Sequence, residues 1–141
     1  MNQKHRIVVA DDNEDFRSSV CALLEDETGV EVVGEADNGP DAIQSASALT
    51  PDLMIVDLSM LRGGAVKAIA QIKLSCPNVR VLLISGHAVT EYADGLLKAG
   101  ADGYLVKGSV GADLTVAVHS LLQGKKFASR ELGLGKAHGI V

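Results

Sequence analysis

The sequence predicts an α/β fold in which one doubly wound, five-stranded parallel sheet lies between two layers of helices. Short runs rich in valine, isoleucine and leucine alternate with longer segments of helical period from Arg6 to Gln123. Several short runs are apolar at consecutive positions, which is typical of parallel strands covered on both faces. Glycine or proline stands where one element ends and the next begins.

Five strands are expected, each followed by a helix. The second strand contains Glu31 and ends next to Glu35, so it suits an edge of the sheet. Right-handed crossovers between parallel strands then give a three-layer sandwich, although spacing alone does not fix the strand order. The expected strands are 7–10, 30–33, 53–56, 79–84 and 104–106, and the expected helices are 15–27, 40–49, 65–75, 91–99 and 112–122.

Length and composition indicate one domain. The chain has 141 residues, 47% of them hydrophobic, and we place the domain at 1–124 with a short, frayed extension or linker at 125–141. A net charge of -5 disfavours direct contact with nucleic acid or an anionic membrane. Cys21 and Cys76 are expected to be buried, reduced thiols. With no signal peptide and no apolar stretch near the ~20 residues of a membrane span, we expect a cytoplasmic protein.

Polar residues collect where four of the predicted strands end. Asp11 and Asp12 follow the first strand, Asp57 the third, Ser85 the fourth and Lys107 the fifth. Ligands of an open parallel sheet bind at this carboxyl edge. Carboxylates on adjacent strands, about 4.8 Å apart, would repel each other unless a cation separates them. Oxygen ligands favour Mg²⁺, and scattered histidines argue against zinc.

A metal at this edge suggests phosphoryl chemistry. Asp57 can act as a nucleophile at phosphorus, while Lys107 neutralises phosphoryl oxygens and Ser85 donates a hydrogen bond. Each residue also has a structural explanation: Asp11-Asp12 as a helix N-cap, Asp57 as the cap of a turn, Lys107 as a surface amine. Their coincidence at one edge favours a site, because capping does not explain a lysine there.

Four segments resemble, in order, the motifs of the response regulator receiver domain family, over about residues 6–123. They are 7–13 around the acidic pair, 51–60 around Asp57, 82–86 around Ser85 and 99–107 ending at Lys107. The resemblance implies a flavodoxin-like sandwich with strand order 2-1-3-4-5. It also implies that Asp57 accepts a phosphoryl group from a phosphohistidine on a sensor histidine kinase or phosphotransfer protein.

The same resemblance implies roles for the other residues. Asp12, Asp57 and the backbone carbonyl of Ser59 would bind Mg²⁺, with Asp11 acting mainly through a coordinated water, and Lys107 would pair with the phosphoryl oxygens. Ser85 would move toward the phosphoryl group and let Tyr104 turn inward, which reshapes the surface of the fourth helix, fifth strand and fifth helix for a downstream target. Ser59 and His87 would tune hydrolysis.

The match is best to receivers that precede a helix-turn-helix output domain. Only residues 108–141 follow Lys107, so we expect a stand-alone receiver or the front part of a longer regulator. Leu61 and Ala65 depart from the proline and glycine usual in the family, which leaves the phosphoryl lifetime open. Whether phosphorylation drives dimerisation also remains open. Two alternatives remain, a degenerate receiver and a flavodoxin-like binding module, although the acidic loop after the first strand would repel a bound phosphate.

Overall fold

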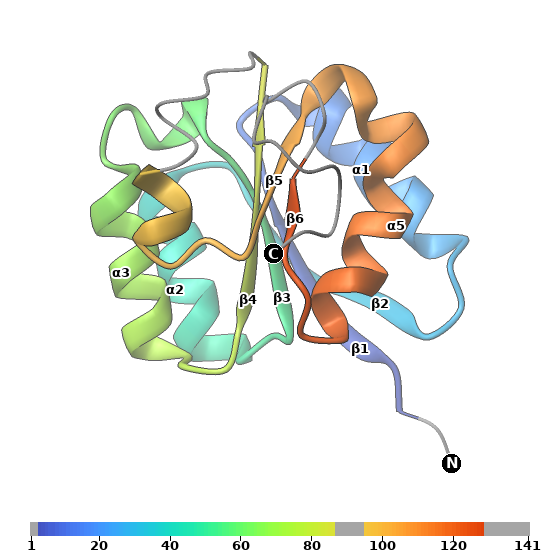
Figure 1. Ribbon diagram of the computed structural model, residues 1–141, viewed down its shortest axis with the longest axis horizontal. Helices are drawn as coiled ribbons and strands as arrows, with labels where there is room; N and C mark the ends of the chain where they lie inside the picture. Colours follow the sequence, from blue (N-terminus) through green and yellow to red (C-terminus); the bar gives the residue numbers. More distant parts are fainter. Residues whose placement is uncertain (1–2, 87–94, 129–141) are drawn as a thin grey trace.

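One parallel sheet runs through the centre of the protein, with helices on both faces (Figure 1). The computed structural model describes residues 3–86 and 95–128. The strands lie in the order β2-β1-β3-β4-β5-β6. Their bounds are β1 His5–Ala10, β2 Val30–Ala36, β3 Leu53–Asp57, β4 Arg80–Ser85, β5 Gly103–Val106 and β6 Phe127–Ala128.

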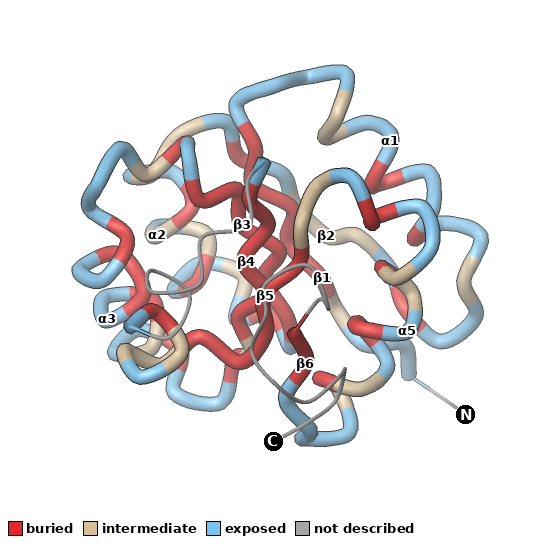
Figure 2. The backbone as a smooth tube through the Cα atoms, turned by 45° about the horizontal axis from the view of Figure 1, so that its top comes forward, coloured by how far each residue is buried: buried red, intermediate tan, exposed pale blue. Residues whose placement is uncertain are grey.

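Helices α2 and α3 cover one face of the sheet, and α1 and α5 cover the other (Figure 1). Their bounds are α1 Glu14–Glu25, α2 Gly39–Leu49, α3 Ala65–Ser75 and α5 Val110–Leu122, with short 3-10 turns η1 Ser59–Leu61 and η2 Lys107–Ser109. The central strands are buried along nearly their whole length (Figure 2). Consecutive apolar residues therefore fill two cores, one on each side of the sheet.

The predicted elements are confirmed wherever the structure describes them, with ends that differ from the prediction by at most three residues. β2 is an edge strand, as its charged residues indicated. Of the helix expected at 91–99, residues 95–98 are helical and residues 91–94 lie outside the described part. Cys21 and Cys76 are free and buried, as predicted.

The predicted number of five strands was wrong, because the described residues already form a sheet of six. The first five take the expected order 2-1-3-4-5, and β6 then pairs in parallel with β5, Gly103 with Phe127 and Tyr104 with Ala128. Gly124, in the left-handed region at φ 87°, ends α5 and turns the chain back along the sheet. We predicted a short frayed extension at 125–141. Of this segment the structure describes residues 125–128, where Phe127 is 1% exposed and pairs with β5, so this part is not frayed. Two apolar residues are too short a run for a periodicity argument.

Asp102 connects this added strand to the rest of the sheet. Its carboxylate accepts a hydrogen bond from the backbone N–H of Val81 at 2.8 Å and pairs with the Lys73 ammonium at 2.7 Å. The ammonium of Lys126 lies 3.4 Å from the other carboxylate oxygen, and the Phe127 N–H donates to the Asp102 carbonyl at 3.3 Å. A largely buried carboxylate thus has partners from α3, β4 and the start of β6.

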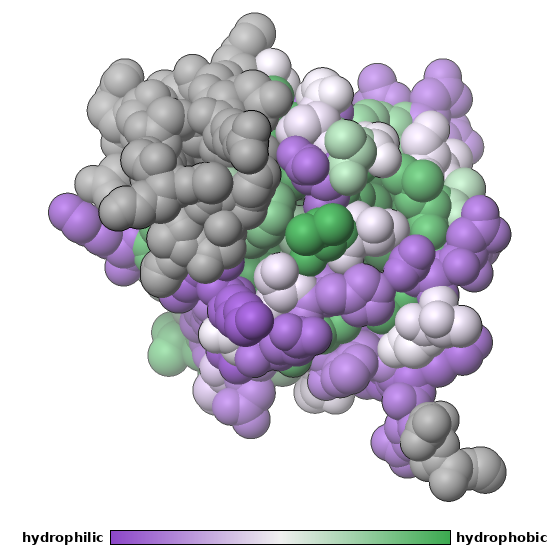
Figure 3. Space-filling model, turned by 45° about the vertical axis from the view of Figure 1, so that its right-hand side comes forward, coloured by the Kyte–Doolittle hydropathy of each residue, from purple (hydrophilic) through white to green (hydrophobic). Residues whose placement is uncertain are grey.

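The surface seen from the α1 and α5 side is mainly hydrophilic with separate apolar residues (Figure 3). Among the large hydrophobic residues described in these two helices, Val116 of α5 is the most exposed, at 55%. Among the helices described, none has the length and apolar character needed to cross a bilayer.

Candidate functional site

The carboxyl edge of the sheet brings the predicted acidic residues together. Asp57 is the last residue of β3 and lies in register with Ile84 of β4, whose carbonyl accepts the Leu58 N–H at 2.8 Å. Asp11 directly follows β1, and its N–H donates to the Ala36 carbonyl at 3.0 Å. The first contact joins β3 to β4 and the second joins β1 to β2, while Ala10 of β1 pairs in parallel with Val56 of β3. The residues that follow β1, β3 and β4 therefore share one edge.

Three carboxyl groups converge there. One oxygen from each of Asp11, Asp12 and Asp57 lies within 4.8 Å of the other two. Asp57 and Asp11 are 1% and 2% exposed, whereas Asp12 is on the surface. Two nearly buried carboxylates and a third on the surface form a cluster whose negative charge requires compensation.

Lys107 supplies part of that compensation. Its ammonium lies 3.3 Å from Oδ2 of Asp11 and 3.7 Å from Oδ1 of Asp57. The same nitrogen is 4.5 Å from the centre of the Phe16 ring, a cation–π contact that limits where the lysine can move. Sequence reasoning missed Phe16, since an apolar residue in the first turn of a helix carries no signal for contact with the lysine that follows β5.

Asp57 has two local donors, both from Ser59. The Ser59 hydroxyl donates to the carboxylate at 3.0 Å from Oδ2 and 3.2 Å from Oδ1, and its N–H lies 3.3 Å from Oδ1. Burial nevertheless raises the pKa of Asp57, and repulsion from Asp11 raises it further, against the lowering effects of Ser59 and Lys107. The free site therefore holds its negative charge at a cost.

The start of α1 fixes Asp11. The Asn13 N–H donates to Oδ1 of Asp11 at 2.8 Å, and the Arg17 guanidinium donates to the Asp11 carbonyl at 2.7 Å. Asn13 itself is the N-cap of α1, because its side chain accepts from the Phe16 N–H at 2.9 Å. Asn13 was also missed as part of the site, although an asparagine at the start of a helical pattern is a recognisable N-cap signal.

The predicted switch residues occupy adjacent strands. Ser85 is buried at the end of β4 in register with Val106, and Tyr104 of β5 is in register with Leu83. Tyr104 is 0% exposed, so its ring already lies inside the protein. A switch at this position therefore requires a second, exposed position of the ring. His87, predicted to tune hydrolysis, lies outside the described residues.

The donor set fits a magnesium ion. All three converging side chains offer carboxylate oxygens, which hard divalent cations prefer, and one lysine balances only part of their charge. The carbonyl of Ser59, the remaining predicted ligand, accepts the Arg62 N–H at 3.2 Å and keeps a second lone pair.

Residues 7–119 match the family model of the response regulator receiver domain. The chain belongs to that family. A response regulator GacA of Pseudomonas viridiflava is 30% identical over 127 residues, which are 90% of this chain and 59% of the relative. A response regulator UvrY of Escherichia coli is 30% identical over 126 residues, 89% of this chain and 58% of the relative. The chain thus spans less than two thirds of these relatives.

Solved structures agree with this membership. A two-component response regulator of the LuxR family from Aurantimonas has a TM-score of 0.84 at 29% identity, covering 93% of this chain and 96% of that one. The signal receiver domain of the putative response regulator NarL from Mycobacterium tuberculosis has a TM-score of 0.81 at 34% identity, covering 87% and 99%. Receiver domains are phosphoryl-accepting switches of two-component signalling and generally bind Mg²⁺.

Proposed function

We propose that this receiver accepts a phosphoryl group on Asp57 from a phosphohistidine of a sensor histidine kinase or phosphotransfer protein. The observation that carries the proposal is the site itself: a nearly buried Asp57, two further carboxyl groups within 4.8 Å and the Lys107 ammonium 3.7 Å away. This set combines a nucleophile, oxygen ligands for a divalent cation and a positive charge for phosphoryl oxygens.

In the transfer, a carboxylate oxygen of Asp57 forms a bond to phosphorus as the phosphorus–nitrogen bond of the phosphohistidine breaks. The bonding electron pair leaves with the imidazole nitrogen, so no oxidant, reductant or water is consumed. Lys107, held between Asp11 and the Phe16 ring, is placed to neutralise a phosphoryl oxygen. The Ser59 hydroxyl donates a hydrogen bond to the Asp57 carboxylate in this structure. It has to turn away from the carboxylate oxygen that attacks phosphorus.

Asp11, Asp12 and Asp57 would hold Mg²⁺ together with the Ser59 carbonyl, Asp11 through a water. Bound there, the ion would supply positive charge that offsets the carboxylates and attracts phosphoryl oxygens. Without the ion, burial and the negative charge of Asp11 both disfavour the ionised form of Asp57, and this raises its pKa.

We further propose that Ser85 and Tyr104 relay phosphorylation to the surface that includes β5 and α5. Both are buried, and they lie two positions apart along neighbouring strands. A phosphoryl group on Asp57 offers new acceptor oxygens to Ser85, and movement of Ser85 changes the space available to Tyr104. The receiver then acts on a downstream protein or on an output domain.

The test uses a small phosphodonor, such as acetyl phosphate or phosphoramidate, with Mg²⁺ and intact-protein mass spectrometry. Wild type should gain one phosphoryl group, and Asp57→Asn should gain none. Asp52→Asn, which changes an exposed aspartate at the opposite end of β3, is the matched control and should be labelled like wild type. A chain that folds and binds Mg²⁺ but is never labelled would instead be a degenerate receiver, and labelling of Asp57→Asn would refute the choice of acceptor.

A further inference from the structure

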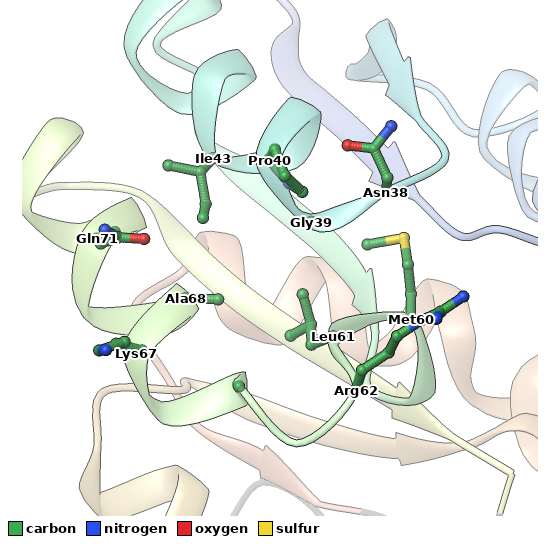
Figure 4. Close-up of a pocket in the computed structure, with 11 residues that line it drawn as sticks. Asn38, Gly39, Pro40, Ile43, Met60, Leu61, Arg62, Lys67, Ala68 and Gln71 are labelled. Carbon is green, nitrogen blue, oxygen red and sulfur yellow. The ribbon is translucent and has the colours of Figure 1, made fainter.

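A groove of about 410 Å³ lies between α2 and α3, beside the loop that follows Asp57. Its apolar lining comes from Pro40, Ile43, Met60, Leu61 and Ala68. Figure 4 shows the side chains of Ile43, Leu61 and Ala68 directed into the same space between the two helices. Most of the surface that an occupant would touch is therefore aliphatic.

Leu61 of the loop lies close to the start of α2. A Cβ atom added at Gly39, the first residue of α2, would lie 3.6 Å from Cδ2 of Leu61, so the leucine reaches across to that helix. The family usually has proline here, whose ring is shorter. This departure, which phosphotransfer does not explain, gives the groove an apolar side chain from the loop.

The charged residues of the groove are both cations. Arg62 and Lys67 line it and are exposed, and no aspartate or glutamate is among the lining residues. Neither cation forms an ion pair with any residue in the described ranges 3–86 and 95–128. Asn38, which also lines the groove, donates hydrogen bonds to the exposed carboxylates of Asp37 and Asp41 at 2.9 and 3.0 Å. The positive charge is therefore confined to the side of Arg62 and Lys67, and an anionic group of an occupant would face that side.

The size of the groove indicates whether its occupant is a small molecule or a protein. Ligand pockets of about 300–1,000 Å³ are typically apolar with a few polar groups that orient the ligand. A standard protein interface uses about 20–30 residues on each side, far more than the lining residues here. The dimensions and the charge together favour a small organic anion.

We propose that this groove binds a small carboxylate with an apolar body, such as a medium-chain aliphatic acid. The apolar body lies against Ile43, Leu61 and Ala68, and the carboxylate faces Arg62 or Lys67. Leu61 and Arg62 are four and five positions after Asp57, and Arg62 has a left-handed backbone with φ 50°. An occupied groove restrains this loop, so the ligand acts on the segment beside the acidic site, whether or not Asp57 is phosphorylated.

The first test is a ¹⁵N–¹H NMR titration of the full chain with octanoate, without Mg²⁺ or phosphodonor. We expect saturable shifts at the amides of Ile43, Leu61, Arg62 and Ala68, with a Kd of about a millimolar for a ligand of this size. Acetate lacks the apolar body and octylamine carries the opposite charge, so neither should produce these shifts. Absence of saturable shifts, shifts centred elsewhere, or equal binding of octylamine would overturn the proposal.

The second test removes the two cations. Arg62→Gln with Lys67→Gln should weaken octanoate binding by about three- to tenfold, since the carboxylate loses charge-assisted contacts at exposed positions. Lys4→Gln with Lys125→Gln removes the same charge from exposed positions away from the groove and should leave the Kd unchanged. Equal affinities of the two double variants would contradict the assignment. The backbone spectrum of each variant reports whether it is folded.

Discussion

Asp57→Asn is expected to make the metal-free protein more stable at neutral pH, even though it removes the proposed acceptor. Asp57 is 1% exposed and an oxygen of Asp11 lies within 4.8 Å. Two unit charges at that distance repel by about 3.5 kcal/mol at an effective dielectric constant of about 20, and by about 0.9 kcal/mol in water. Asparagine keeps the shape of the side chain and an oxygen that can accept from Ser59.

The loss of attraction to Lys107 opposes this gain. The ammonium is 3.7 Å from Asp57, but at 3.3 Å it is nearer to Asp11, and the lysine side chain is 26% exposed. Solvent screens its attraction, and in the variant it keeps its pair with Asp11. Burial adds to the cost of the Asp57 charge and is the largest cause of its raised pKa. We therefore expect a net gain of about 1–2 kcal/mol in the free energy of unfolding.

The sign of the pH dependence follows from the same shift. Because the folded-state pKa of Asp57 is raised, the unfolded chain releases this proton at lower pH than the native protein does. Between the two pKa values the native state binds more protons, so the contribution of Asp57 to stability falls as pH rises. The advantage of Asp57→Asn should vanish below the ordinary aspartate pKa of 3.8 and reach its full size above the folded pKa.

Urea denaturation followed by far-UV circular dichroism, in buffer with EDTA, measures the difference. Glu31→Gln, which removes an exposed carboxylate from β2, is the control and should change stability little. In the same buffer without EDTA, Mg²⁺ at ten times its Kd should stabilise wild type by about 1.4 kcal/mol and the variant much less. An Asp57→Asn protein that is less stable than wild type at pH 7 without metal would refute the electrostatic reasoning.

Three further predictions concern the scaffold. Asp102→Ala should lower the free energy of unfolding by about 2–4 kcal/mol, because Lys73 and the Val81 N–H lose a nearly buried partner; unchanged guanidinium denaturation would contradict this. Gly103→Ala should lower the free energy of unfolding by about 1–3 kcal/mol in the same assay. The new Cβ would lie 3.0 Å from side-chain atoms of Leu82 and Leu121 and 3.2 Å from the Phe127 carbonyl oxygen. An unchanged stability would mean that β6 shifts easily to make room. Burial raises the pKa of Cys21 to about 11, so iodoacetamide at pH 8 should modify it slowly in the native protein and readily in guanidinium; fast native labelling would show that α1 opens.

The sequence alone determined the alternation of strands and helices and the edge at which the chemistry collects. Strand residues such as 53–57 are apolar at consecutive positions because both faces are covered, and this pattern is local. In a parallel sheet all strands end at the same side, so Asp11, Asp57, Ser85 and Lys107 could be assigned to one edge without coordinates. A local pattern combined with a general rule of topology was sufficient.

Only the tertiary structure decided which other residues complete these sites. Phe16 meets Lys107 across elements far apart in the chain, and Asp102 gathers Lys73 and Lys126 from α3 and the start of β6. β6 itself is two residues long and forms because β5 offers an unpaired edge. The groove between α2 and α3 also depends on helix packing, since Ile43 and Leu61 are neighbours only in the fold. Contacts between distant elements leave no periodic trace in the sequence, because each partner alone is an ordinary residue of its own helix, strand or loop.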